Sequence, residues 1–222
     1  MKTRNAKNFM ISSSLMVMFI LFTLMVKFIE VKPIGPQESS VGLATLNTWA
    51  HNLLGVNMTL YNVIDWASIL TLPIMLGFAA LGLCQLIKKR SLFKVDSSIL
   101  ALGSFYIIVL AFYLFFEYFI INYRPVLING FLEASYPSST TMLVMCVMPT
   151  AMMQFKRLIK SDKAKKIINT FCGVFTGLMV IGRLVSGVHW VTDILGGALL
   201  STALVMLYFS ANKLIDSKKS NE

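Results

Sequence analysis

Six long apolar stretches dominate this sequence and restrict it to one class of fold. They lie at about 9–29, 61–87, 98–121, 138–155, 167–186 and 192–211, and each is near the roughly 20 residues that a membrane-spanning helix requires. Only 14% of the residues are charged, whereas soluble domains carry about a quarter. The sequence therefore predicts an all-α, polytopic membrane protein, with a single six-span domain over residues 1–222.

The basic residues predict the orientation of these spans. Sixteen of the 20 lysines and arginines fall before the first stretch, between the second and third, between the fourth and fifth, or after the sixth. Because basic loops stay in the cytoplasm, we expect both termini to be cytoplasmic in a multi-pass protein of the cell membrane. The net charge of +10 then reflects topology, and no nucleic-acid partner is expected.

Three loops should lie on the opposite, extracytoplasmic side. The first, about 30–60, contains apolar residues at helical spacing (Leu46, Trp49, Leu53 and Leu54) that predict a short interfacial helix. The second carries Arg124, and the third runs from Arg183 to Asp193. Polar side chains from separate loops thus reach the same outer surface.

A cation, an imidazole and a carboxylate, namely Arg183, His189 and Asp193, interrupt the apolar pattern near the C-terminus. His189 and Asp193 are four residues apart and share a face if the stretch is helical, so the carboxylate could hold the imidazole in one tautomer. The other ring nitrogen would then be free to act as a nucleophile. Ionisable groups beside lipid are costly, which makes this cluster a candidate site.

The outer surface also offers groups that suit a phosphate. Arg124 and Arg183 carry planar guanidinium forks that match phosphate oxygens. Ser138 and Ser139 begin the fourth span, where hydroxyls and free backbone N–H groups can hold an anion. Positive charge around a phosphoryl group, together with a nucleophile, is what phosphoryl transfer requires.

This order of residues resembles the type 2 phosphatidic acid phosphatase (PAP2) superfamily of six-span lipid phosphatases. That family reads Lys-x6-Arg-Pro, then Pro-Ser-Gly-His, then Ser-Arg-x5-His-x3-Asp. This chain has Arg-Pro at 124–125, Pro-Ser at 137–138 and the full Arg-x5-His-x3-Asp pattern at 183–193. The resemblance covers roughly residues 117–193, and the hydropathy pattern extends it to the whole chain.

The resemblance implies a role for each matching residue. His189 would be the residue that is phosphorylated, Asp193 its orienting partner, and Arg124 and Arg183 the phosphate ligands. The substrate would be a membrane lipid phosphate drawn from the bilayer. No metal ion and no other cofactor is implied.

The chain departs from the family pattern at positions where chemistry is expected. Glu117 stands where the family has its lysine, and Thr140 where it has the histidine of the second motif. Ser139 and Gly182 replace a glycine and a serine. A missing proton donor disfavours alkoxide leaving groups, because general acid catalysis typically contributes 10²–10⁴-fold. We therefore expect a polyprenyl or lipid diphosphate, whose leaving group is a weak base, in preference to phosphatidic acid.

Several alternatives remain open at this point. Glu117 could donate the proton if burial raised its pKa, or could form an ion pair with Arg124. His189 and Asp193 could be a structural pair, and Ser138, Ser139 and Thr140 could simply begin a helix. His51, the only other histidine, could replace the missing acid. The protein could also be a silent lipid-phosphate-binding or accessory member, or a lipid phosphotransferase.

Overall fold

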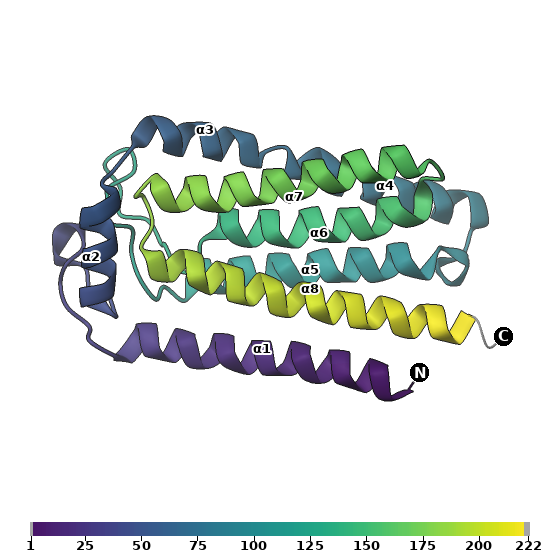
Figure 1. Cartoon of the computed structure of the whole chain (residues 1–222), viewed down its shortest axis with the longest axis horizontal. Helices are drawn as coiled ribbons and strands as arrows, with labels where there is room; N and C mark the ends of the chain where they lie inside the picture. Colours follow the sequence, from purple (N-terminus) through teal and green to yellow (C-terminus); the bar gives the residue numbers. More distant parts are fainter. Residues whose placement is uncertain (1, 220–222) are drawn as a thin grey trace.

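The computed structural model describes residues 2–219, and side chains from 6 to 217, as a bundle of long helices (Figure 1). The elements in chain order are α1 (Lys2–Phe28), η1 (Pro36–Glu38), α2 (Ala44–Leu54), α3 (Met58–Ser68), α4 (Thr71–Lys89), η2 (Leu92–Lys94), α5 (Ser97–Tyr118), α6 (Ser139–Leu158), α7 (Asp162–Val185) and α8 (Val191–Lys219). No strand occurs within 2–219, although three isolated β-bridges do. Met1 and residues 220–222 of the predicted domain lie outside the described residues.

The helices confirm the predicted all-α membrane fold. By length and apolarity, five segments of the described chain qualify as membrane spans: Ala6–Phe28, Met58–Lys89, Ser97–Tyr118, Asp162–Val185 and Val191–Ser217. The remaining predicted span is α6, whose 20 residues measure about 30 Å and match the bilayer core. α6 is less apolar than the other spans because it contacts mainly protein and not lipid: half of its residues are buried among the other helices.

The second predicted span differs from expectation, because it is two helices instead of one. α3 ends at Ser68 and α4 begins at Thr71, with a turn at Ile69 and Leu70 between them. Pro73 lies in the first turn of α4, where its missing N–H costs no helical hydrogen bond. The break lets α3 pack against α7 while α4 packs against α5 and α6.

The predicted interfacial helix is α2, which crosses one end of the bundle (Figure 1). Its apolar side chains Trp49 and Leu53 point outward, while Asn47 is fully buried on the opposite face. The amide of Asn47 donates to the carbonyl of Gly42 at 2.8 Å, and its Oδ1 accepts from the Thr192 N–H at 3.3 Å. α2 is thereby tied to the first turn of α8, next to the predicted site.

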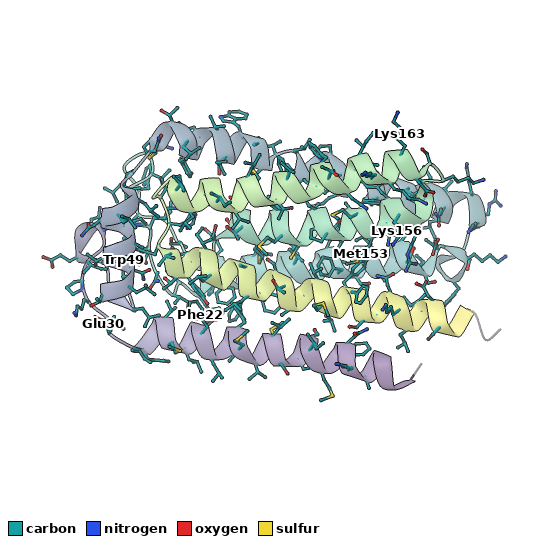
Figure 2. The ribbon with its side chains drawn as sticks, in the orientation of Figure 1. Phe22, Glu30, Trp49, Met153, Lys156 and Lys163 are labelled. Carbon is teal, nitrogen blue, oxygen red and sulfur yellow. The ribbon has the colours of Figure 1, made fainter. Side chains whose placement is uncertain are left out.

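The two ends of the bundle differ in charge. Lys156 and Lys163 lie at the end where α1 begins and α8 finishes, whereas Glu30 and Trp49 lie at the α2 end (Figure 2). Each cation placed at the α2 end has a partner: Lys27 donates to the Ile120 carbonyl, Lys32 pairs with Glu30, and both arginines pair with carboxylates. The predicted site therefore lies at the end of the bundle opposite Lys156 and Lys163 (Figure 2).

Candidate active site

The loop between α5 and α6 carries Arg124 on a short irregular hairpin. A β-bridge joins Tyr123 to Ala134, the Arg124 N–H donates to the Glu133 carbonyl at 3.1 Å, and the Ser135 N–H donates to the Asn122 carbonyl at 2.9 Å. This antiparallel pairing places Arg124 opposite Glu133 and Ser135 opposite Asn122, so Arg124 and Ser135, 11 positions apart in the sequence, lie on the same short hairpin.

The connection between α7 and α8 carries the rest of the cluster. Arg183 lies in the last turn of α7, and Gly187 follows with φ of +66°. A Cβ at Gly187 would lie 1.7 Å from the Gly55 carbonyl oxygen, so glycine is required both by conformation and by space. This tight turn brings His189 back over the end of the bundle.

Asp193 lies in the first turn of α8, and its carboxylate accepts the Trp190 N–H at 2.9 Å. That bond caps the helix in the manner of a capping box, and a carboxylate at this position also suits the helix dipole. The indole of Trp190 donates to the Tyr123 carbonyl at 2.7 Å, which joins this helix start to the hairpin. The orientation of Asp193 is thus fixed by the backbone.

The four residues of the predicted constellation converge in this structure. The Arg124 Nη1 atom lies 3.3 Å from His189 Nε2, and His189 Nδ1 lies 3.5 Å from Asp193 Oδ2. Side chains of Arg183, His189 and Asp193 are almost completely buried. Burying charged side chains this completely is costly unless they are paired, so their convergence indicates a functional site.

Two carboxylates outside the predicted set pair with the arginines. Glu133 Oε2 lies 3.1 Å from Arg124 Nε, and Asp65 Oδ1 lies 3.3 Å from Arg183 Nη1. The suggested pair between Glu117 and Arg124 is therefore wrong; the hairpin presents Glu133 to this arginine instead. Both carboxylates are partly exposed, which keeps these pairs weak enough for another anion to compete.

Tyr61 of α3 packs against both guanidinium groups. The Arg183 Cζ lies 4.7 Å from the centre of its ring and the Arg124 Cζ lies 5.7 Å from it. Tyr61 and Asp65 are one helical turn apart and therefore share a face of α3. The sequence analysis missed Tyr61, Glu133 and Ser135, because no motif or spacing connects them to the cluster.

The surroundings of His189 keep its imidazole neutral. Burial lowers its pKa well below the usual value of 6.5, and the nearby charges of Arg124 and Arg183 lower it further. Arginine has no acceptor, so the contact with Arg124 makes Nε2 the unprotonated nitrogen and leaves the proton on Nδ1. A neutral imidazole whose Nε2 is unprotonated is the form that can attack phosphorus once the Arg124 contact is released.

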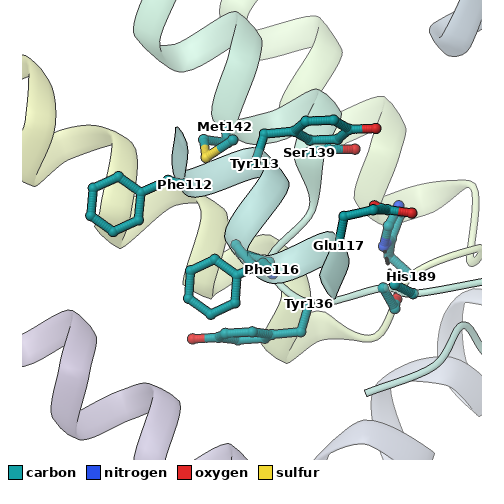
Figure 3. Close-up of a pocket in the computed structure, with 11 residues that line it drawn as sticks. Phe112, Tyr113, Phe116, Glu117, Tyr136, Ser139, Met142 and His189 are labelled. Carbon is teal, nitrogen blue, oxygen red and sulfur yellow. Dashed lines mark hydrogen bonds between the residues drawn. The ribbon is translucent and has the colours of Figure 1, made fainter. Parts of the chain in front are cut away.

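A narrow cavity of about 20 Å³, room for about one water molecule, opens beside His189. Glu117, Ser139 and His189 line it, and Figure 3 shows the Glu117 carboxylate next to the imidazole. Ser138 does not line it: its hydroxyl accepts the Thr141 N–H at 3.4 Å and its own N–H donates to the Asp193 carbonyl at 3.0 Å. Of the two predicted serines, Ser139 is the one that borders the cavity.

Thr140 and His51 lie apart from this cavity. Thr140 lines an apolar groove of about 370 Å³ between α4, α5 and α6. His51 packs against Trp190, with ring centres 5.4 Å apart, and burial lowers its pKa. No group of His, Cys, Asp and Glu within the described chain has the arrangement of a metal site.

Comparisons with known proteins agree with this geometry. The model of the PAP2 superfamily matches residues 99–215, which is more than half of the chain. The match includes Arg124, Glu133, Ser135, Arg183, His189 and Asp193, and leaves out Tyr61 and Asp65 of α3. The chain belongs to the PAP2 superfamily. The match contains the hairpin, α6 and the connection between α7 and α8, so the family assignment and the buried cluster fall on the same part of the molecule.

One relative and one solved structure extend the comparison. Over 74 residues, or 33% of this chain, it is 40% identical to phosphatidylglycerophosphatase B of Bacillus subtilis (strain 168), and that segment spans 36% of the relative. A crystal structure of a transmembrane PAP2-type phosphatidylglycerolphosphate phosphatase from Bacillus subtilis resembles the fold, with a TM-score of 0.56 and 21% identity over 93% of this chain and 96% of the other. A multi-pass membrane protein with the PAP2 fold follows.

Proposed function

We propose that this protein is a membrane phosphatase that removes phosphate from a lipid phosphate or diphosphate through a phosphohistidine intermediate. One observation carries the proposal: the neutral imidazole of His189 borders a small cavity, has its Nε2 lone pair aimed at the buried guanidinium of Arg124, and lies close enough to Arg183 to feel its charge. The arginines can therefore bind an anion at the place where the imidazole can attack it.

The proposed reaction begins when a phosphate displaces the weak carboxylate partners and binds Arg124 and Arg183. A phosphoryl oxygen then takes the Arg124 Nη1 donor, which frees His189 Nε2. Nε2 forms a bond to phosphorus while the bond from phosphorus to the leaving oxygen breaks. Water next attacks the phosphohistidine, the P–N bond breaks, and inorganic phosphate leaves.

The residues on the leaving-group side favour a diphosphate substrate. Thr140 cannot act as an acid near neutral pH, and Glu117 lines the cavity where the family has a lysine. An alkoxide would have to leave without a general acid to protonate it, which is slow. A phosphate monoester is a weaker base and can leave without being protonated. A diphosphate also offers more oxygens for two arginines whose charges are partly neutralised by Glu133 and Asp65.

The shape of the apolar groove supports a long lipid tail. The groove that contains Thr140 shares Tyr113, Ser139 and Met142 with the cavity at His189, and shares Met75 and Tyr106 with a second groove of about 400 Å³. Ile99 lines the second groove and Tyr113 the first, and the two residues are about 21 Å apart along the axis of α5. This exceeds the roughly 15 Å of one leaflet's hydrocarbon, so the two connected grooves can accommodate a long lipid tail.

We also propose that the site faces the extracytoplasmic side and that both termini are cytoplasmic. Lys156 and Lys163 lie at the end of the bundle where α1 begins and α8 finishes (Figure 2), and the positive-inside rule assigns that end to the cytoplasm. The substrate headgroup would then bind at the outer leaflet.

The test is phosphate release by the detergent-purified protein from a polyprenyl diphosphate and from phosphatidic acid. His189→Ala should abolish release, and His51→Ala, the matched histidine control, should retain it. Faster turnover of the diphosphate would support the missing-acid argument, and equal turnover would refute it. Vanadate binding without any release above the His189→Ala background would favour a silent binding protein, and labelled phosphate on an acceptor lipid would indicate a phosphotransferase.

A further inference from the structure

The hydroxyl of Ser135 lies between the imidazole of His189 and the carboxylate of Asp193. Its Oγ is 3.0 Å from His189 Nδ1 and donates a hydrogen bond to Asp193 Oδ2. We propose that Ser135 is a positioning residue that links Asp193 to His189 during catalysis, an inference that rests on the proposed phosphatase activity.

The distances favour the link through the hydroxyl over direct contact between histidine and aspartate. His189 Nδ1 is 3.5 Å from Asp193 Oδ2, which exceeds the usual range of an N–H···O hydrogen bond, whereas its distance to Ser135 Oγ is well within that range. A serine hydroxyl can accept one hydrogen bond and donate another. Because Nδ1 carries the proton, the chain runs from Nδ1–H to Oγ, and from Oγ–H to Oδ2.

Each member of this chain is held in position by its own backbone. The Ser135 N–H donates to the Asn122 carbonyl, and Asp193 Oδ2 also accepts the Trp190 N–H. Ser135 and Asp193 are both buried, so water does not compete for these bonds. The hairpin that holds Ser135 also holds Arg124, so a single loop contacts both ring nitrogens of His189.

The link matters when the phosphohistidine forms. The ring gains positive charge as Nε2 bonds to phosphorus, and its Nδ1–H remains in place throughout the step. The Ser135 dipole and the Asp193 carboxylate stabilise that charge, which disappears again when water breaks the P–N bond. Ser135→Ala would remove the hydroxyl and leave Nδ1–H with the Asp193 carboxylate at 3.5 Å and the main-chain carbonyl of residue 135, which also interacts with His189. Loss of such a buried bond to a charged ring should lower kcat about 10- to 100-fold and leave KM nearly unchanged.

The experiment compares Ser135→Ala with Ser135→Thr, which restores a hydroxyl, and with Ser201→Ala. Ser201 is an equally buried serine whose hydroxyl donates to the Gly197 and Met142 carbonyls and contacts neither His189 nor Asp193. Phosphate release gives kcat and KM. In a His51→Asn background the ¹⁵N NMR spectrum contains one histidine and reports the titration of His189 directly.

We expect Ser135→Ala to lower kcat and shift the His189 titration to lower pH, Ser135→Thr to recover at least part of kcat, and Ser201→Ala to change neither. The proposal is overturned if Ser135→Ala leaves the His189 titration unchanged, whatever happens to the rate. If His189→Ala retains phosphate release, the proposed function fails, while a shifted titration in Ser135→Ala still demonstrates the coupling. The two failures are thus distinguishable.

Discussion

The guanidinium of Arg124 donates from Nη1 to Nε2 of His189 at a distance of 3.3 Å, and the two residues are 65 positions apart in the chain. This contact occupies the lone pair that would attack phosphorus, so a bound phosphate must replace it. Arg124 is therefore expected both to orient the resting imidazole and to hold the transferring group.

Replacing Arg124 with alanine should lower kcat/KM about 10²- to 10³-fold, the usual effect of losing one donor to transition-state charge. Phosphate release from a polyprenyl diphosphate measures it. Arg157→Ala is the matched control, because that arginine forms an exposed ion pair with Asp216 on α8, in the half of the bundle remote from the site. A loss below tenfold for Arg124→Ala would argue against phosphate binding by this residue.

The pH dependence should report the lowered pKa of His189. Protonated imidazole cannot attack, so kcat/KM should hold constant down through pH 6.5 and fall only at lower pH, as His189 takes up its proton. The free energy of unfolding should also fall as the pH drops below 6.5. In that range His189 is protonated in the unfolded chain but stays neutral in the folded protein, so acid favours the unfolded state. Kinetics and ¹⁵N NMR of His189 in the His51→Asn background both measure this. A midpoint at or above 6.5 would contradict it.

Glu133→Gln should strengthen phosphate binding. The change removes the carboxylate 3.1 Å from Arg124 Nε and keeps the backbone bond between the same two residues. Since Glu133 is partly exposed, the gain should be modest, about two- to fivefold in the Kd of vanadate. Asp216→Asn, which frees Arg157 from its exposed pair, should leave vanadate binding unchanged. Weaker binding in Glu133→Gln would mean that the carboxylate orients Arg124.

Thr140→His restores the family histidine at the rim of the apolar groove. If the missing acid limits alkoxide departure, turnover of phosphatidic acid should rise by up to about 100-fold, the lower end of the contribution of general acid catalysis. Turnover of a polyprenyl diphosphate should change far less, because its leaving group needs no proton. The ratio of the two rates is the measurement, and an equal effect on both substrates would count against the argument.

Gly187→Ala should destabilise the protein and disrupt the site. The left-handed φ of +66° alone costs a side chain about 1–2 kcal/mol, and the new Cβ would collide with the Gly55 carbonyl. Gly173→Ala is the matched control, since a Cβ there meets nothing within 4 Å and alanine favours the helix. Thermal unfolding in detergent should give a lower Tm for Gly187→Ala only. An unchanged Tm would show that the turn can rearrange.

Much of the architecture was predictable because membrane insertion is a local property. Runs of apolar residues about 20 long mark the spans, and their flanking charges are visible without any tertiary information. The amphipathic spacing around Trp49 likewise predicted α2. The break between α3 and α4 was missed, because the residues on both sides of Ile69 and Leu70 are apolar and the hydropathy pattern does not reveal a change in helix direction.

The sequence by itself determined which residues are proposed to bind and attack a phosphate. Arg124, Arg183, His189 and Asp193 interrupt apolar surroundings, and the fixed spacing of the last three leaves few other arrangements. Only the tertiary structure decided their partners. Ser135 reaches His189 and Asp193 across 54 and 58 residues, and Glu133 and Asp65 reach the arginines through a hairpin and a helix that no motif connects to them. Hydrogen bonds require placement within a few tenths of an ångström, which depends on packing between distant elements and not on local composition.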